Sequence, residues 1–375
     1  MKKNIAILSI KDLRKAPRID REIKALSNDF NIQLIGEHHT AFKELNFYNL
    51  YTFRVFFDKL SYYIKRKLNP LAEQKFSKLK NHFTEQKVEL LIIHEPHFLP
   101  LAVKLKKEIG IKIVFNAHEY HPLEFEDRPD WLVTKGKQYN NLYRHYLNEL
   151  DLFINVSDGI RVKCKQEFDV DSIVIPNASY YQEISIKICD SFPIKMVHHG
   201  VILPSRQIEK MIEIVNILGE NFTLDIIGVI SDDNKEYVKE IKKQIDKASN
   251  IRFLEPKSYS EIIPFINNYD LGFYFMVGNS FNNRNALPNK LFEFIQARLA
   301  IAITPIPEMK VIVEKYNIGV VSKESTVDSM VDSLKSLTPN GVQQYKENTI
   351  STAKIECADE YQKLFLKNIL SLVSN

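Results

Sequence analysis

The stretch 285–293, which reads Asn-Ala-Leu-Pro-Asn-Lys-Leu-Phe-Glu, combines residue types that suit the binding of an anion. An apolar run at 271–277 and a polar loop precede it, and apolar residues at helical spacing follow it. Pro288 suits the first turn of a helix, where its missing N–H is no loss. We therefore expect a helix whose N-terminus, with unpaired N–H groups and a positive dipole end, binds a phosphate.

Glu293 lies about a turn and a half beyond Asn289 on the same predicted helix. Because a carboxylate would be repelled by a bound phosphate, we expect Glu293 to bind the hydroxyl groups of an attached sugar instead. The alternative is that Glu293 is a solvated helix residue without a ligand.

These residues, with others downstream, resemble the C-terminal signature of the bacterial group 4 nucleotide-sugar glycosyltransferases. The resemblance implies the GT-B fold and two glutamates with seven residues between them. The second glutamate, which binds the ribose, corresponds to Glu293, whereas the first, which contacts the donor sugar, corresponds to Asn285. An amide at that position can hydrogen-bond but carries no charge. The matching elements are 287–293, Ala297, a strand at 300–303, Pro307-Glu308 and 316–319.

The same resemblance assigns further donor contacts. Gly200 lets the backbone approach a ligand, and Arg206 supplies a forked donor to phosphate oxygens, as does the family's glycine-then-arginine element beneath the pyrophosphate. Asn289 and Lys290 complete the predicted diphosphate site, while Pro256 marks the region 255–259 where related proteins bind the nucleobase. Lys210 is expected to face solvent.

The first half of the chain carries the candidate contacts to the sugar and the acceptor. The phrase 116–119 resembles the family's histidine-containing strand end, which implies that His118 contacts the donor sugar. Arg18 and Glu119 are the acceptor-side candidates, and Arg18 follows the first strand at the edge where ligands of open α/β sheets bind. The alternative is that Arg18 and Arg21 form the solvated face of a helix.

No metal site is expected. Four histidines, at 94, 97, 118 and 121, follow two predicted strands, but no acid stands at the spacing of a zinc protease motif. Asp169 and Asp171 have the D-x-D spacing of a cation site, which is weak support by itself. His94 and His97 can equally cap the strand that they follow.

Composition indicates an ordinary globular protein of two domains. The chain has 375 residues, 45% of them hydrophobic and 26% charged, with a net charge of +4. This mild excess of positive charge excludes a typical nucleic-acid binder and is compatible with anionic substrates or lipids. Three widely spaced cysteines indicate reduced thiols in a cytoplasmic protein.

Apolar runs alternate with amphipathic helical stretches in both halves. This pattern predicts two doubly wound, Rossmann-like α/β domains. The resemblance to GT-B enzymes implies that they face each other across a cleft, with an N-terminal acceptor-side domain at 1–182, a nucleotide-sugar domain at 192–355 and a C-terminal helix at 356–375 that crosses back to the first domain. The predicted strands are 4–10, 31–35, 88–93, 111–116, 152–156 and 172–175, then 195–199, 222–227, 251–254, 270–276, 300–303 and 319–322.

The segment 53–67 has aromatic residues on one helical face and flanking lysines and arginines. Such a helix can bind an anionic membrane surface, or it can pack on its own domain with its basic residues in solvent. No run of about 18 apolar residues predicts a transmembrane helix. We therefore expect a cytoplasmic protein, with peripheral binding at the inner face of the membrane as an option.

Together these features predict a glycosyltransferase that moves a sugar from a nucleotide-diphosphate donor to an acceptor hydroxyl without a metal or other cofactor and with retention at the anomeric carbon. The expected acceptor is a glycan or lipid-linked molecule of cell-surface polysaccharide synthesis. The alternatives are a nucleotide-sugar epimerase, a sugar phosphorylase, a glycoside hydrolase, or a binding protein of two domains without catalysis.

Overall fold

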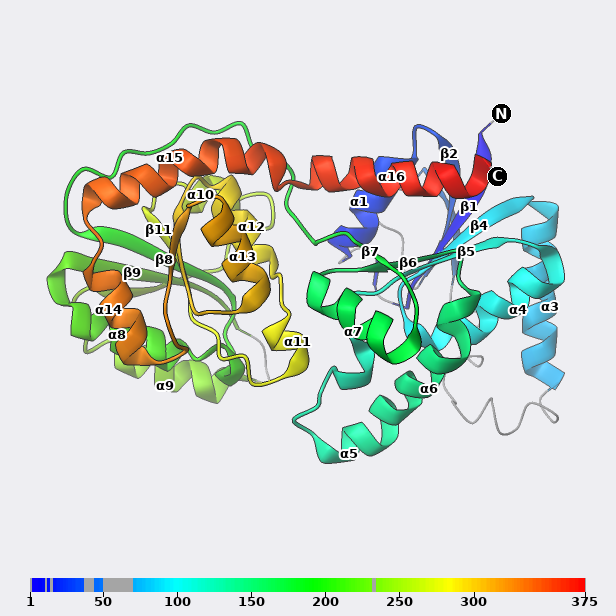
Figure 1. Ribbon diagram of the computed structural model, residues 1–375, viewed down its shortest axis with the longest axis horizontal. Coiled ribbons are helices and arrows are strands. Elements are labelled where there is room, and N and C mark those ends of the chain that lie inside the picture. The colour runs from blue at the N-terminus through cyan, green and yellow to red at the C-terminus, as the bar shows by residue number, and fades with distance from the viewer. Residues whose placement is uncertain are drawn as a thin grey trace. The chain divides into compact units, whose positions relative to one another are not determined.

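The computed structural model describes residues 2–10, 12–13, 16–36, 44–49, 70–230 and 234–374 (Figure 1). The chain divides into two compact units. The first unit comprises Met1–Pro176 and Gln362–Asn375, and the second comprises Asn177–Tyr361. The stretch 180–192, which separates the two series of predicted strands, belongs to the second unit. The membrane-binding prediction at 53–67 lies outside the described residues.

The sheet of the first unit has seven parallel strands in the order β3-β2-β1-β4-β5-β6-β7. The strand order reverses between β1 and β4, which are neighbours, and this is where ligands of doubly wound sheets bind. The strands are β1 Lys3–Leu8, β2 Phe30–Gly36, β3 Asn46–Asn49, β4 Val88–Ile93, β5 Lys112–Asn116, β6 Leu152–Asn155 and β7 Ile173–Val174.

Helices connect these strands as the alternating sequence pattern predicts. Their bounds are α1 Pro17–Leu26, α3 Pro70–Glu85, α4 Leu99–Ile109, α5 Pro129–Trp131, α6 Lys137–Tyr146 and α7 Asp158–Phe168. Sequence reasoning missed β3, because this short edge strand has only two aromatic residues between two asparagines and forms no apolar run.

The second unit repeats the design with six parallel strands in the order β10-β9-β8-β11-β12-β13. Here the order reverses between β8 and β11. The strands are β8 Ile194–Val201, β9 Phe222–Val229, β10 Ile251–Leu254, β11 Leu271–Tyr274, β12 Ala300–Ile303 and β13 Gly319–Val321.

The helices α8 to α15 lie around the second sheet (Figure 1), and the last helix, α16, runs to the C-terminal end of the chain. The division between the units falls inside α16, at Tyr361 and Gln362. The helices are α8 Ile208–Leu218, α9 Lys235–Ile245, α10 Ile262–Ile266, α11 Phe281–Arg284, α12 Asn289–Gln296, α13 Pro307–Lys315, α14 Val327–Lys335, α15 Pro339–Ile355 and α16 Ala358–Ser374.

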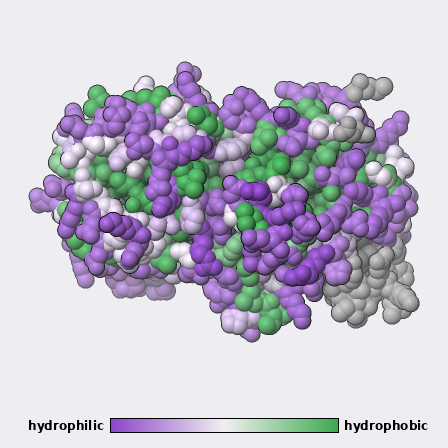
Figure 2. Space-filling view, in the orientation of Figure 1, coloured by the Kyte–Doolittle hydropathy of each residue, from purple (hydrophilic) through white to green (hydrophobic). Residues whose placement is uncertain are grey.

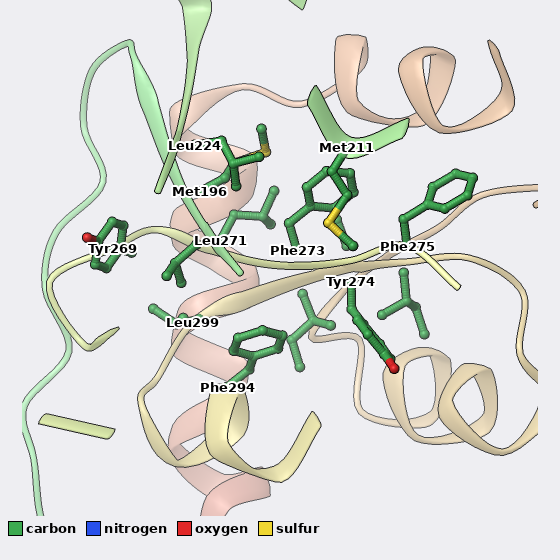
Figure 3. Close-up of a cluster of buried hydrophobic side chains, with 14 of the residues drawn as sticks. Met196, Met211, Leu224, Tyr269, Leu271, Phe273, Tyr274, Phe275, Phe294 and Leu299 are labelled. Carbon is green, nitrogen blue, oxygen red and sulfur yellow. The ribbon is translucent and has the colours of Figure 1, made fainter. Parts of the chain in front are cut away.

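Buried apolar side chains of the strands and helices form a core around each sheet. In the second unit, Phe273 and Tyr274 leave opposite faces of β11, as alternation along a strand requires (Figure 3). Phe273 joins the apolar cluster on one face. Tyr274 packs on the other face with its hydroxyl directed away from Phe273, so a polar atom reaches the edge of an apolar core (Figure 3).

The surface is mainly hydrophilic on the face shown in Figure 2, with apolar residues in scattered groups. No helix in the described part of the chain is long and apolar enough to span a membrane. Cys164, Cys189 and Cys357 are buried and form no disulfide.

Candidate functional site

The candidate site of the second unit lies where β8 and β11 end side by side. His198, His199 and Gly200 stand near the carboxyl end of β8, and Tyr274 is the last residue of β11. These positions mark the point where the strand order reverses, and the first turn of α12 approaches them through Lys290. The fold therefore places the predicted donor residues at the usual ligand edge of such a sheet.

Position 200 requires a glycine for two reasons, its backbone conformation and the closeness of the Lys290 side chain. Its φ is +119°, a conformation that L side chains rarely adopt. A Cβ atom at this position would lie 2.8 Å from Nζ of Lys290. The missing side chain thus lets the Lys290 ammonium group lie directly against the backbone of β8.

The helix α12 begins at Asn289, one residue later than the expected start, and Pro288 is the residue before it. No side chain caps this N-terminus, and its first turn contains no acidic residue. The Nδ2 group of Asn177 donates to Oδ1 of Asn289 at 2.6 Å, which fixes the Asn289 amide. Asn177 thus orients a residue of the predicted anion site.

Arg206 and Lys290 bring two positive charges together. Nη1 of Arg206 donates to the Tyr274 hydroxyl at 2.8 Å, and Nζ of Lys290 lies 5.2 Å from the centre of the Tyr274 ring. Within the described residues, neither cation has a carboxylate at ion-pair distance, although the Glu293 carboxylate is near enough to favour the charged form of Lys290. Burial and the charge of Arg206 nevertheless lower the pKa of Lys290 to about 8.

His198 and His199 lie near the end of β8 and are neutral imidazoles. Nδ1 of the buried His198 donates to the carbonyl of Phe273 at 3.0 Å, and its Nε2 has no hydrogen-bond partner in the part of the chain that the structure describes. Burial and the charge of Lys290 lower the pKa of His198 well below its usual range and that of His199 to about 3. Both rings can therefore accept hydrogen bonds at neutral pH.

Glu293 lies one turn beyond Lys290 on α12 and is 6% exposed, so the alternative of a solvated helix residue is wrong. Its Oε2 atom is 3.4 Å from Nε2 of His199. The carboxylate thereby lies near Lys290, on the buried side of the helix and beyond ion-pair distance. This geometry suits hydroxyl groups of a ligand whose phosphates lie at the helix N-terminus.

The remaining donor candidates lie in loops. Nδ2 of Asn285 donates to the carbonyl of Phe281 at 2.8 Å, which turns the amide back onto the short helix α11. Pro256 is exposed in the loop after β10, two strands away from β8. Lys210 is not simply in solvent, because its Nζ lies 5.6 Å from the centre of the Phe275 ring. The roles of Asn285 and Pro256 stay predictions.

The first unit contains a second polar cluster, also at a reversal of strand order. Glu22 of α1 accepts hydrogen bonds from Nε2 of His94 at 3.1 Å and from Nδ2 of Asn116 at 2.5 Å. Nδ1 of His94 lies 3.1 Å from Nε2 of His118, the residue predicted to contact the donor sugar. Sequence reasoning missed Glu22; the available signal was an acid on the apolar face that contains Ile19 and Leu26.

The acceptor-side candidates differ in exposure. Arg18 and Arg21 are buried, so the alternative of a solvated helix face is wrong for both. Nη2 of Arg18 donates to the carbonyl of Ile175 at 2.9 Å, which gives this guanidinium a structural partner. Glu119 is exposed next to the partly exposed His118. An acceptor role for Arg18 and Glu119 stays a prediction.

The side chains considered as metal ligands contact other residues of the chain. Asp169 and Asp171 are exposed and pair with Lys165 at 2.8 and 3.1 Å. Burial lowers the pKa of His97 to about 4, and its ring stacks at a tilt on Phe98. Among the described residues, no group of three or more His, Cys, Asp or Glu side chains has a geometry that could hold a metal ion.

Two doubly wound parallel α/β units are the architecture of the GT-B fold, and known proteins show the same fold. Sucrose-phosphate synthase of Thermosynechococcus elongatus superposes with a TM-score of 0.76 at 9% identity over 100% of both chains. A glycosyltransferase of Rickettsia africae gives 0.72 at 12% identity over 100% of this chain and 99% of that one. HepE of Anabaena, in complex with UDP and glucose, gives 0.71 at 13% identity over 99% and 100%.

Sequence comparison gives the family of the second unit. Residues 190–355 match the family model described as glycosyl transferases group 1. The sequence has no significant match among curated proteins. The chain thus has the GT-B fold, and its second unit carries a domain that matches glycosyl transferases group 1, which confirms the resemblance inferred from the stretch that follows Asn285.

Proposed function

We propose that the protein transfers a sugar from a nucleotide-diphosphate donor to an acceptor hydroxyl, and that the second unit binds the donor. The observation that carries this proposal is the pair Arg206 and Lys290, held beside an uncapped helix N-terminus without a carboxylate partner among the described residues. Two neighbouring cations at a helix N-terminus suit a ligand with two adjacent phosphate groups.

The same groups supply the chemistry of the leaving group. Cleavage of the anomeric bond places negative charge on the departing diphosphate, which Arg206, Lys290 and the N–H groups of α12 stabilise. These fixed charges do the work that a divalent cation does at other phosphate sites, so we propose transfer without a metal. We carry over retention from the resemblance: the departing phosphate oxygen takes the acceptor proton on the face that it leaves.

The nucleoside and the sugar are assigned to neighbouring groups. Glu293 accepts hydrogen bonds from the ribose hydroxyls, and Asn285 and His118 orient the transferred sugar. A uridine nucleotide is the first choice, since HepE is known in complex with UDP and the Escherichia coli trehalose-6-phosphate protein is known bound with UDP-2-fluoroglucose. The loop around Pro256 is assigned to the base.

The proposed setting is cytoplasmic synthesis of a bacterial cell-surface polysaccharide, with a glycan or lipid-linked acceptor. The net charge of +4 and the basic amphipathic segment 53–67 support an encounter with an anionic membrane surface. The three buried thiols without disulfides support a reducing compartment.

Thermal unfolding with a panel of UDP, GDP, ADP, CDP and TDP tests the donor site. A ligand at 100 times its dissociation constant adds about 2.7 kcal/mol to the free energy of unfolding. We expect one nucleoside diphosphate to stabilise the protein, and the corresponding nucleoside to have little effect because it lacks the phosphates. If no nucleotide in the panel stabilises the protein, the proposal is wrong.

Product analysis then separates the transferase from its rivals. Incubation of the nucleotide sugar with glycan acceptors should release nucleoside diphosphate and form a new glycosidic bond. An epimerised nucleotide sugar in the absence of acceptor, or a sugar phosphate in the presence of inorganic phosphate, would identify the two enzymatic alternatives. Binding without any turnover would identify a binding protein.

A further inference from the structure

Tyr274 interacts with both cations of the donor site through different parts of its side chain. Nη1 of Arg206 donates to its hydroxyl at 2.8 Å, and Nζ of Lys290 lies 5.2 Å from the centre of its ring. Tyr274 is the last residue of β11 and is 1% exposed, so close packing restricts its movement. Its hydroxyl points away from Phe273 (Figure 3). One buried side chain therefore contacts both of the groups that are proposed to bind the diphosphate.

The hydrogen bonds of the Tyr274 hydroxyl have a defined direction. A guanidinium group has no acceptor, so the hydroxyl oxygen accepts from Arg206 and its proton points to another group. That group is Sδ of Met276, 3.4 Å away. The N–H of Met276 donates to Oγ1 of Thr304 at 3.1 Å, and this Oγ1 donates to the Met276 carbonyl at 2.6 Å. The acceptor for Arg206 is thus held in place by the protein itself.

A tyrosine holds a cation without neutralising it. Burial raises the pKa of Tyr274, although the charge of Arg206 opposes this shift, so the hydroxyl is uncharged at neutral pH. Neither Arg206 nor Lys290 has a carboxylate at ion-pair distance in the described part of the chain. A carboxylate in place of Tyr274 would compensate one positive charge and compete with the phosphates of a ligand. Tyr274 leaves both charges available to an anion.

His198 supports the ring of Tyr274. The two rings stack with their centres 5.7 Å apart and an angle of 18° between their planes. Nδ1 of His198 donates to the carbonyl of Phe273 at 3.0 Å, which fixes the imidazole. Burial and the charge of Lys290 lower the pKa of His198 well below its usual range, so this ring adds no third positive charge.

Arg206 keeps N–H groups for a ligand. It ends the short 3₁₀ helix Pro204–Arg206 and is partly exposed. Within the described residues only its Nη1 atom forms hydrogen bonds, to Tyr274 and, at 4.0 Å, to Sδ of Met276. Nη2 and Nε can therefore present the forked donor that suits phosphate oxygens. A side chain that is ordered before binding loses less conformational entropy when the ligand arrives.

We propose that Tyr274 is a positioning residue that orders Arg206 and Lys290 in the free protein, so that both cations meet a diphosphate without rearrangement. The class of ligand rests on the proposed function. The placement of the two cations on Tyr274 rests only on contacts inside the second unit.

The order of the Arg206 side chain can be measured without a ligand. Nitrogen-15 relaxation of arginine-labelled protein gives an order parameter for the Nε–H group, and Arg206→Lys assigns its signal. We expect an order parameter above about 0.6 in the wild type and below it in Tyr274→Phe, which loses only the hydroxyl oxygen. A mobile Arg206 in the wild type, or an equally ordered one in Tyr274→Phe, would overturn the proposal. The wild-type measurement is decisive even if Tyr274→Phe does not fold.

Ligand binding shows whether the Tyr274 hydroxyl acts through Arg206. With inorganic pyrophosphate and UDP as probes in calorimetric titration, we expect affinity to fall about 10-fold in Tyr274→Phe and about 100-fold in Arg206→Ala. Adding Tyr274→Phe to Arg206→Ala should cause no further loss, because there is no guanidinium left to hold. A general disturbance of the fold would instead lower affinity by the same factor in both backgrounds, and such additive losses would contradict the proposal.

The ring of Tyr274 should act through Lys290. Tyr274→Leu removes the ring as well as the hydroxyl, and with it the attraction between an ammonium group and an aromatic face. We expect Tyr274→Leu to bind pyrophosphate about 5-fold more weakly than Tyr274→Phe, and this additional loss to vanish when Lys290 is replaced by alanine. An additional loss of the same size without the Lys290 ammonium group would mean that the ring does not position it.

Tyr269→Phe is the matched control. Tyr269 lies in the same unit, and its hydroxyl donates to Oδ2 of Asp225 at 2.6 Å. Arg252 also bonds this carboxylate, so the variant leaves Asp225 paired. We expect a lower melting temperature with unchanged affinity for pyrophosphate and unchanged order of Arg206. An affinity loss as large as that of Tyr274→Phe would show that any buried hydroxyl of this unit has the same effect, and the specific role of Tyr274 would be wrong.

The positioning role and the proposed function fail in different ways. If pyrophosphate binds with the expected dependence between Tyr274 and Arg206, but no nucleoside diphosphate binds more tightly than pyrophosphate, the positioning role holds and the nucleotide-sugar donor is wrong. If UDP binds and sugar is transferred while Tyr274→Phe keeps wild-type affinity, only the positioning role is wrong. If the wild type binds neither pyrophosphate nor any nucleotide, both proposals are wrong.

Discussion

Each unit has a cluster of polar side chains where the order of its strands reverses, but the charged groups of the two clusters are paired differently. In the second unit, Lys290 and Arg206 approach each other without a carboxylate at ion-pair distance among the described residues. In the first unit, the Glu22 carboxylate has donors on both oxygens, His94 and Asn116. The comparison teaches that one architecture can hold a pair of cations that a ligand must neutralise and a carboxylate whose two oxygens are already hydrogen-bonded.

The consequence is a difference in how each site responds to substitution. Removing a cation from the second unit relieves repulsion in the free protein and costs mainly ligand affinity. Removing the carboxylate from the first unit leaves buried donors unpaired and costs stability. The following experiments test this contrast in order of decreasing expected effect.

Lys290→Ala should have the largest effect on the donor. A charge-assisted hydrogen bond is worth about 1.5–3 kcal/mol, so we expect nucleoside diphosphate affinity to fall about 100-fold, with no loss of thermal stability in the absence of ligand. Calorimetric titration measures the affinity, and melting curves without ligand measure the stability. Lys243→Ala, at an exposed lysine that pairs with Glu240, is the control. Wild-type affinity in Lys290→Ala would contradict the anion site.

Gly200→Ala should reduce both stability and affinity. The positive φ strains any L side chain by about 1–3 kcal/mol, and the added Cβ displaces the Lys290 ammonium group, 2.8 Å away. Gly110→Ala in the first unit is the matched control, since Gly110 also has a positive φ, +75°, but open space at its Cβ. We expect Gly110→Ala to lower the melting temperature alone. Equal affinities of the two variants would mean that Gly200 matters only for its backbone.

Glu293→Gln should weaken binding of the nucleoside diphosphate about 10-fold, because a carboxylate accepts hydroxyl hydrogen bonds more strongly than an amide. The ribose assignment is sharpened by comparing UDP with 2′-deoxy-UDP in calorimetry. The deoxy ligand should bind more weakly than UDP to the wild type, and the difference should shrink in Glu293→Gln. A difference of the same size in both proteins would show that another residue holds the ribose. Glu314→Gln, at an exposed residue of α13, controls for the charge change.

The pH dependence of donor binding should be the smallest effect. The pKa of Lys290 is about 8 in the free protein, below the usual value for lysine, and a bound diphosphate should raise it. Above pH 8 binding must therefore take up a proton, and affinity should fall about fourfold by pH 8.5. Calorimetry in buffers of different ionisation enthalpy measures this uptake. Lys290→Arg stays charged and should remove the dependence; a dependence that persists in this variant would place the titrating group elsewhere.

Lys290 affects the free energy of unfolding in the opposite direction: as the pH rises, donor affinity falls but the contribution of Lys290 to stability increases. Because the folded-state pKa of Lys290 lies below its unfolded value, the unfolded chain binds more protons between about pH 8 and the usual lysine range. This group therefore favours folding increasingly as the pH rises through that window. Ligand-free melting temperatures of wild type and Lys290→Arg, compared across the window, separate this contribution from that of other lysines.

Several positions show where sequence reasoning succeeded and where it could not. The strand 300–303 and the helix after Pro288 follow from local patterns, an apolar run and helical spacing, and the structure has both. Tyr274 could not be recognised as a site residue, because it stands within an apolar run and only the sheet places its hydroxyl beside Arg206. The buried state of Arg18 and Arg21 was likewise hidden, since a charged helix start usually faces solvent.

The sequence by itself determined the two parallel α/β units, the family resemblance and the helix that presents Lys290 and Glu293, because these depend on periodicity and on residues close together in the chain. Only the tertiary structure decided that Gly200 admits the ammonium group of Lys290 and that Glu22 reaches His118 through His94. Those contacts join residues that are 24, 72 and 90 positions apart in the chain. No local pattern specifies the register and packing that bring such atoms together.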